Sequence, residues 1–432
     1  MTPVVTPPME SGPWPADMRK RAGSAPSRIL YVRLDGIGDA VLSGCLLEGL
    51  AAVWPGVPVT AVCDIPVAPI FEASPFIDTV IPLVRSRLLE DAYRAEAIVR
   101  LAGSGADMAF NGVLSPSGPV ADVLAGLPMR LVSLPPDSVN MPPAERDAFT
   151  ARIDSLIPIN PGPRRELAAY ADALAWLGAP EIAARPRLWL RPADEAAAGE
   201  LWEESGLTRG KTIALFAAGA MAEKGYAGYG DALASVCREQ GLGVAALGAG
   251  RDAALAEMNL EPLRARGVRT ANLCANGSML SSAAFLRDCR LALGADTGMS
   301  HIACALGIPL AVLVSGAFFG RFHPYQQDVT AIYLPLSCAG CRGVCRFERP
   351  LCMAGVVPET VEEAVRYALA QKAGMPRKTL FMQAPEWTPP PLLRDLACGV
   401  TPPVWESPAD FIATFKKAPG DRRLHVVLGP KP

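Results

Sequence analysis

The segment Leu293–Pro309, with the sequence LGADTGMSHIACALGIP, constrains the fold more than any other part of the chain. The apolar run over 290–294 predicts a buried strand, and Met299–Leu306 predicts a helix that ends at Gly307 and Pro309. The turn between them lies at the carboxyl end of a strand and the amino end of a helix. Unpaired backbone N–H groups and the helix dipole make such a turn a site for an anion, for example a diphosphate.

The side chains of this turn suit the same purpose. Asp296, Thr297 and Gly298 form the turn itself, where the threonine adds a hydroxyl and the glycine permits a close approach of the backbone. His301 follows one helical turn later and faces the same point. We therefore expect these four residues to line an anion-binding pocket.

Strands and helices alternate through most of the 432 residues, which predicts the α/β class with parallel sheets covered by helices on both faces. A chain of this length favours two domains. The expected division is a disordered segment over 1–27, a first domain over 28–190, a linker over 191–210, a second domain over 211–372 and a Pro-rich tail over 373–432. Within the first domain, the Pro-rich stretch 134–163 is expected to be irregular.

Composition excludes several function classes. The net charge is −2, from 41 basic and 43 acidic residues, which argues against a general nucleic-acid binder. Half of the residues are apolar, so the chain as a whole is not disordered. We find neither an uninterrupted apolar run of about 18 residues nor a signal peptide, and the cytoplasm is the expected compartment.

A second strand–turn–helix lies near the N-terminus, at Gly36-Ile-Gly-Asp39. It begins like a dinucleotide-binding G-x-G-x-x-G motif, but Val41 occupies the third glycine position, which disfavours an NAD site. The helix is expected from Ala40 to Val53, with Asp39 at its amino end. This aspartate is either a helix cap or a carboxylate at the mouth of a cleft that accepts a proton from a hydroxyl.

Two further charged residues follow strands in the second half of the chain. Lys224 lies in the loop that begins near Gly219, where it is either a surface lysine or a cation that neutralises a diphosphate. Asp252 follows the strand that ends at Gly248, where it either caps the loop or binds ribose hydroxyls.

Eleven cysteines are too few for a disulfide framework, and seven are scattered among apolar neighbours. The other four cluster as Cys338, Cys341, Cys345 and Cys352. Their spacing is that of a tetrahedral thiolate site for structural Zn or Fe, and four reduced thiols in a loop are the alternative.

The ordered blocks along Arg28–Ala370 resemble glycosyltransferase family 9, the ADP-heptose:lipopolysaccharide heptosyltransferases. The opening strand and turn 28–39, the blocks 54–60 and 74–80, and the loop 219–224 look like the corresponding family blocks. The most specific block, GADTGMSH over 294–301, resembles the family's D-T-G-x-x-H signature.

This resemblance implies a GT-B fold, in which two Rossmann-like doubly wound domains face each other across a cleft. The N-terminal domain would take the acceptor and the C-terminal domain the nucleotide sugar. The implied reaction is an inverting, metal-independent transfer of a heptose-like sugar from a donor such as ADP-heptose. The acceptor would be a lipopolysaccharide-core glycan, free or lipid-linked, at the inner membrane surface; a protein acceptor and a non-catalytic nucleotide-sugar binder are the alternatives.

The resemblance also implies a role for each matching residue. Asp39 would be the general base, Asp252 would bind ribose, and Asp296 and His301 would line the pocket. The diphosphate would be held by the residues Gly219, Ala220, Lys224, Thr297 and Gly298. The cysteine cluster recurs in some members of the family and is expected to be structural.

Overall fold

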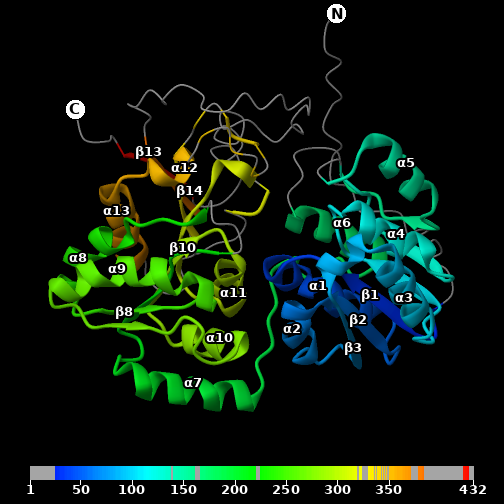
Figure 1. The fold of residues 1–432 in the computed structure, drawn as a ribbon, viewed down its shortest axis with the longest axis horizontal. Coiled ribbons are helices and arrows are strands. Elements are labelled where there is room, and N and C mark those ends of the chain that lie inside the picture. Colours follow the sequence, from blue (N-terminus) through cyan, green and yellow to red (C-terminus); the bar gives the residue numbers. More distant parts are fainter. Residues whose placement is uncertain are drawn as a thin grey trace, which may run out of the picture.

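The computed structural model describes residues 25–137, 140–160, 166–219, 224–318, 321–323, 329–334, 336, 338–341, 343, 345, 347, 350–370, 378–383 and 422–427. The segment predicted to be disordered, 1–27, lies outside these residues except for its last three. Figure 1 shows two halves side by side, each with a sheet at its centre.

The first half is built on a six-stranded sheet in the order β3-β2-β1-β4-β5-β6, with every pair of neighbours parallel. Its strands are β1 Ile29–Arg33, β2 Val59–Asp64, β3 Thr79–Leu83, β4 Met108–Asn111, β5 Arg130–Ser133 and β6 Ser155–Leu156. Its helices are α1 Ile37–Val53, α2 Ala68–Glu72, α3 Asp91–Ala102, α4 Gly118–Gly126, α5 Pro143–Ala151 and α6 Glu166–Leu177.

The second half is built on an eight-stranded parallel sheet in the order β14-β13-β12-β11-β10-β7-β8-β9. Its strands are β7 Thr212–Phe216, β8 Gly243–Ala246, β9 Thr270–Asn272, β10 Leu291–Ala295, β11 Leu310–Leu313, β12 Val329–Tyr333, β13 Lys378–Gln383 and β14 Arg422–Val427. Its helices are α7 Pro192–Ser205, α8 Tyr229–Gln240, α9 Ala253–Ala265, α10 Met279–Arg287, α11 Gly298–Leu306, α12 Leu351–Ala354 and α13 Pro358–Ala370.

The predicted α/β fold with parallel sheets is confirmed. In each sheet the strand order reverses at one point, between β1 and β4 in the first and between β7 and β10 in the second. Ligands of such sheets bind outside the carboxyl ends of the strands at this point of reversal. The loops that follow β1, β7 and β10 are therefore the places where a site is expected.

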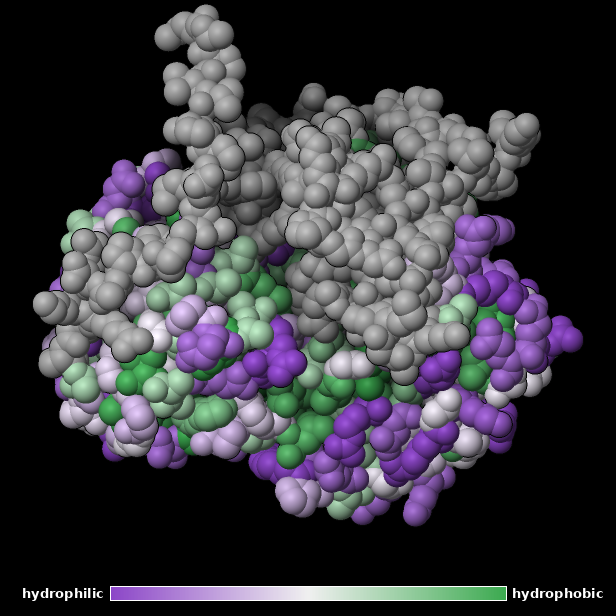
Figure 2. Space-filling view, turned by 180° about the vertical axis from the view of Figure 1, so that it is seen from behind, coloured by the Kyte–Doolittle hydropathy of each residue, from purple (hydrophilic) through white to green (hydrophobic). Residues whose placement is uncertain are grey.

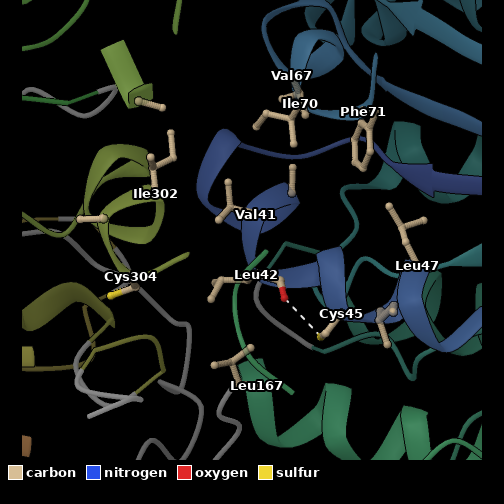
Figure 3. Packing of buried hydrophobic residues seen from close by; sticks show 14 of the residues in the cluster. Val41, Leu42, Cys45, Leu47, Val67, Ile70, Phe71, Leu167, Ile302 and Cys304 are labelled. Atoms are coloured by element: carbon tan, nitrogen blue, oxygen red, sulfur yellow. Dashed lines mark hydrogen bonds between the residues drawn. The ribbon is translucent and has the colours of Figure 1, made fainter. Parts of the chain in front are cut away.

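The two halves share one apolar core. A single cluster of buried side chains includes residues of α1, α6, α11, β1 and β7. In Figure 3, Val41 and Leu42 of α1 lie across from Ile302 and Cys304 of α11. Because this packing joins helix to helix across the molecule, it holds the carboxyl ends of the two sheets at a fixed separation.

Two boundaries in the first half differ from the sequence prediction. Helix α1 begins at Ile37 rather than Ala40, because Gly36 is the extended N-cap and the Asp39 side chain accepts a hydrogen bond from the Gly36 N–H at 3.2 Å. The stretch predicted to be irregular, 134–163, contains α5, whose first residue is Pro143. Proline is favoured at this position since the first helical N–H needs no partner within the helix.

The segment predicted to be a linker, 191–210, contains the helix α7. Pro192 begins this helix, and Asp194 caps it by accepting from the Arg191 N–H at 2.9 Å. Its Trp202 stacks on Phe285 of α10, with ring centroids 3.9 Å apart. The helix is stable because it buries this apolar face. In the sequence, the many charged residues of the segment make the apolar face difficult to recognise. Within the segment predicted to be a tail, 373–432, β13 and β14 extend the second sheet.

We expect Trp202→Ala to lower the free energy of unfolding by about 3 kcal/mol, since the change opens a cavity beside Phe285. The wild-type indole is only 5% exposed. Urea denaturation followed by circular dichroism measures the effect. Met258→Ala, at a side chain that is 59% exposed, is the control and should change the value by less than about 0.5 kcal/mol. Equal effects of the two substitutions would contradict the packing of α7 on α10.

Candidate nucleotide-sugar site

A cavity of about 450 Å³ lies between the two halves, at the carboxyl ends of β1, β7 and β10. It brings together all but one of the residues that the sequence predicted for the cleft. They are Asp39, Gly219, Lys224, Asp252, Asp296, Thr297, Gly298 and His301. The remaining one, Ala220, lies outside the described residues.

The amino ends of α1 and α11 meet at this cavity. A Cβ atom added to Gly38 would lie 2.5 Å from Cδ2 of His301, and one added to Gly298 would lie 2.8 Å from Cγ2 of Ile37. Neither contact leaves room for a side chain, so both positions require glycine. The positive ends of two helix dipoles therefore point into the same cavity, where they favour a bound anion.

Asp39 both caps a helix and lines the cleft, the two roles that its sequence position left open. It lies in the first turn of α1, where its Oδ2 accepts from the Gly36 N–H, and it also lines the cavity. The hydrogen bond fixes the orientation of the carboxylate while the side chain stays partly accessible. A carboxylate held in this way can accept a proton from a hydroxyl bound in the cavity.

Lys224 is not a surface lysine. Its side chain is only 13% exposed, and its ammonium lies 2.5 Å from the backbone oxygen of Asp296 and 3.8 Å from Oδ2 of the same residue. The ring centroid of Phe318 lies 5.9 Å from Nζ. These contacts hold a positive charge at the wall of the cavity beside the amino end of α11.

Asp296 is a buried carboxylate that remains ionised. Burial opposes its charge, but Lys224 and the hydrogen bond from His301 hold the pKa of the carboxyl well below its usual range. Nε2 of His301 lies 3.3 Å from Oδ1. Oδ2 of Asp296 and Oγ1 of Thr297 are buried and have no hydrogen-bond partner among the described residues. Such groups are suited to a polar ligand in the cavity, because a buried polar group without a partner is costly.

His323 belongs to the same cluster, although no sequence motif pointed to it. Its Nε2 lies 3.1 Å from Oγ of Ser300 and 3.7 Å from Oδ1 of Asp296. Its ring stacks on that of His301, with centroids 4.7 Å apart. Burial and the neighbouring His301 lower the pKa of His323 to about 3, so the ring is neutral at physiological pH.

Within the described residues, Asp296, His301 and His323 form a group whose ligand atoms all lie within 4.8 Å of one another, as in a metal site. The ammonium of Lys224 already supplies a positive charge 3.8 Å from the carboxylate. Repulsion by this ammonium disfavours a second cation at the same carboxylate. We therefore assign the group to the positioning of α11 and Lys224.

Asp252 caps a loop, as one of its two alternatives predicted. Its Oδ2 accepts from the Ala249 N–H at 2.9 Å, and the residue is buried. It also lines the cavity, together with Ala275. Ala275 has a φ of 68°, a left-handed conformation that is uncommon for residues other than glycine. Ribose binding by Asp252 stays a prediction.

The four clustered cysteines line a second, small cavity of about 30 Å³. Lys224 lines this cavity as well as the larger one, so the two lie back to back. The thiol of Cys352 accepts a hydrogen bond from the backbone N–H of Gly316. Gly316 begins a short 3-10 helix, Gly316–Phe318, whose last residue is the aromatic neighbour of Lys224.

The pKa of His323 has a consequence for stability. In the unfolded chain this histidine takes up a proton near pH 6.5, whereas in the folded chain it stays neutral down to about pH 3. The folded state therefore loses stability as the pH falls below about 6.5, by about 1.4 kcal/mol per pH unit. Between pH 6.5 and 5, we expect the unfolding free energy of wild type to fall by about 2 kcal/mol relative to that of His323→Gln. Urea denaturation at a series of pH values measures this difference, and parallel pH profiles would contradict it.

No helix of the described residues combines the length and the apolar composition needed to cross a membrane.

Comparison with known proteins shows which family the chain resembles. Solved structures share the fold: a family 9 glycosyl transferase from Veillonella parvula has a TM-score of 0.64 and 18% identity, and the match covers 80% of this chain and 98% of that one. E. coli ADP-heptose lps heptosyltransferase II has a TM-score of 0.56 and 17% identity, and the match covers 79% of this chain and 98% of that one. E. coli heptosyltransferase WaaC with ADP-2-deoxy-2-fluoro heptose has a TM-score of 0.55 and 15% identity, and the match covers 79% of this chain and 99% of that one. These matches confirm the GT-B-like fold.

No curated protein matches the chain by sequence. Residues 164–350 match the model of glycosyltransferase family 9 (heptosyltransferase), and this range contains Lys224, the turn after β10 and the histidine cluster. This match, together with the shared fold, confirms the resemblance of the chain to glycosyltransferase family 9.

Proposed function

We propose that the chain is an inverting glycosyltransferase that moves a heptose-like sugar from ADP-heptose to a hydroxyl of a cell-envelope glycan, the lipopolysaccharide core. One observation carries the proposal: the amino ends of α1 and α11 and the ammonium of Lys224 converge on one cavity that also holds Asp39. This arrangement supplies positive charge for a leaving diphosphate and a carboxylate for the attacking hydroxyl. The match of residues 164–350 to the family 9 model supports the same reaction class.

The donor's diphosphate would lie at the amino end of α11. There the backbone N–H groups, the hydroxyl of Thr297 and the ammonium of Lys224 can all donate to phosphate oxygens. Gly219 permits the loop after β7 to approach Thr297 closely, since a Cβ atom at position 219 would lie 2.5 Å from Cγ2 of Thr297. Asp252, which also lines the cavity, would accept hydrogen bonds from ribose hydroxyls.

The chemical step needs one proton acceptor and one stabilised leaving group. Asp39 would take the proton of the acceptor hydroxyl as its oxygen forms a bond to the anomeric carbon of the sugar. The bond from that carbon to the diphosphate oxygen breaks, and the electron pair stays on the nucleoside diphosphate. Lys224 and the dipole of α11 stabilise this negative charge. Attack from the side opposite the leaving group inverts the anomeric configuration.

The choice of ADP-heptose rests on the family and on the solved relatives of E. coli, one of which is described with ADP-2-deoxy-2-fluoro heptose. The glycan acceptor rests on the family alone. Transfer to a protein hydroxyl, and binding of the nucleotide sugar without transfer, are the outcomes that would replace this part of the proposal.

We propose in addition that Cys338, Cys341, Cys345 and Cys352 hold a structural Zn or Fe ion. All four line one small cavity, and a backbone N–H donates to the sulfur of Cys352, as is common around metal-bound thiolates. Four thiolates fill a tetrahedral site, so the ion would brace the loop and take no part in the transfer.

Two substitutions separate the proposed roles at the transfer site. Asp39→Asn should lower turnover by about 1000-fold and leave ADP affinity unchanged, because it removes the base but not the phosphate ligands. Lys224→Met should weaken ADP binding by about 10-fold to 100-fold, because it removes a charged hydrogen bond. Isothermal titration with ADP and a transfer assay with ADP-heptose measure both quantities.

Lys211→Met, at an exposed lysine, is the matched control and should behave as wild type. A thermal-shift screen of ADP-, UDP- and GDP-sugars tests the donor, since a ligand at about 100 times its Kd adds about 2.7 kcal/mol of stability. A larger shift with a UDP- or GDP-sugar would overturn the choice of ADP, and full turnover by Asp39→Asn would remove Asp39 from its role.

Metal analysis of the purified chain tests the cysteine site. We expect about one equivalent of Zn or Fe per chain, falling below about 0.2 equivalents in the double variant Cys341→Ser, Cys345→Ser, which removes two of four ligands. Cys237→Ala, which removes a core cysteine of α8, is the control and should keep the metal. A wild-type content below about 0.2 equivalents would contradict the proposal.

A further inference from the structure

We propose that Arg321 is a positioning residue that ties the donor-binding half to the half that carries Asp39. The catalytic part of this proposal rests on the function proposed above; the structural part does not. Arg321 belongs to the second half of the chain, yet its guanidinium contacts Glu166, Ser115 and Asp137 of the first half.

The contacts of Arg321 reach three separate elements. Its Nε donates to Oε2 of Glu166 at 3.0 Å, at the start of α6. Its Nη2 donates to Oγ of Ser115 at 2.9 Å, in the loop after β4. Its Nη1 lies 3.7 Å from Oδ2 of Asp137, in the loop after β5. The backbone oxygen of Arg321 also accepts from the Glu166 N–H at 3.2 Å.

This ion pair is buried on both sides. The side chain of Arg321 is 8% exposed and that of Glu166 only 2%. Burial opposes the charge of Arg321, but Glu166, Asp137 and Asp39 hold the pKa of its guanidinium above the ordinary value. When one partner of such a pair is removed, the other charge stays buried without compensation, and water or a rearrangement of the two halves must relieve it.

The contacts continue from Glu166 toward Asp39. Oε1 of Glu166 accepts from the hydroxyl of Tyr170 at 2.9 Å, and this hydroxyl accepts from Nη1 of Arg33 at 2.9 Å. Nη2 of Arg33 lies 2.7 Å from Oδ2 of Asp35. Asp35 immediately precedes Gly36, the N-cap of the helix in which Asp39 is fixed. A connected set of polar groups, buried except for the partly exposed Asp35, thus leads from Arg321 to the loop that orients Asp39.

The two residues after Arg321 reach the donor side. Phe322 lines the larger cavity and packs edge-to-face on His301, with ring centroids 5.6 Å apart. His323 contacts Ser300 of α11. Phe322 and His323 therefore contact the donor-binding helix α11. The preceding residue, Arg321, contacts the first half through Glu166. From this arrangement we infer that Arg321 sets the distance between the bound donor and Asp39.

The inference predicts different effects on ADP affinity and on the rate of transfer, whereas a merely structural role of Arg321 would lower both together. Arg321 is not among the residues that line the cavity, so its loss should leave ADP affinity within about threefold of wild type. Its loss should misplace Asp39 relative to the donor, and an error of about 1 Å between reacting groups costs about 100-fold in rate.

The experiment compares Arg321→Ala with wild type in three measurements on the full chain: the affinity for ADP, the turnover number at saturating donor, and hydrogen exchange of the backbone amides of α1 and α6. We expect unchanged affinity, a turnover number lower by about 100-fold, and exchange of the first amides of α6 faster by about 10-fold. Arg321→Lys keeps the charge but not the forked geometry, so it should recover part of the turnover.

The matched control is Arg366→Ala, which removes an arginine that binds Glu239 and Glu362 within the second half alone. It should match wild type in affinity, turnover and exchange. If Arg321→Ala does not fold, Glu166→Gln keeps the shape of the pair and should show a smaller loss of the same kind.

The proposal fails if Arg321→Ala has wild-type turnover and exchange, or if it loses ADP affinity and turnover in the same proportion. A wild-type chain that binds ADP but transfers no sugar would refute the proposed function, and the exchange data would still decide whether Arg321 joins the two halves.

Discussion

The close approach of two helix ends is the constraint on which the rest of the structure depends. The amino end of α1 comes from one half and that of α11 from the other, and they approach so closely that Gly38 and Gly298 leave no room for a side chain. Two positive dipole ends repel each other at this distance unless negative charge lies near them. Asp39 and Asp296 supply part of that charge. The cavity between the helices is thus prepared for an anion before any ligand arrives.

The same approach explains why the two halves carry one continuous core. Behind the helix ends, apolar side chains of α1 pack on those of α11, as Val41 and Ile302 do in Figure 3. This apolar packing offsets the repulsion between the helix dipoles at the amino ends of α1 and α11. Figure 2 shows apolar surface between hydrophilic patches on the rear face of the molecule, where the two halves adjoin. The cavity therefore lies at the end of a packed interface, and its width depends on that interface.

Much of this arrangement is predictable from sequence because it is local. The apolar run before Asp296 and the helix after it are adjacent in the chain, and so are the strand and helix around Asp39; both units are confirmed. The helix α7 within the predicted linker was not predicted, because it packs through Trp202 on Phe285, a contact between residues far apart in sequence. His323 and the contacts of Arg321 with the first half were not predicted for the same reason: the partners lie on other elements, and no motif surrounds the two residues.

The distribution of charge shows how the halves depend on each other. Around the cavity, the second half supplies the cation Lys224, and its neighbour Asp296 is a carboxylate that this cation neutralises. On the acceptor side, the carboxylates of Glu166 and Asp137 belong to the first half, and Arg321 of the second half pairs with them. Separation of the halves would therefore break these ion pairs, in addition to exposing the shared apolar core. Apolar packing and these ion pairs therefore act together against separation of the halves, and the width of the cavity between them depends on both.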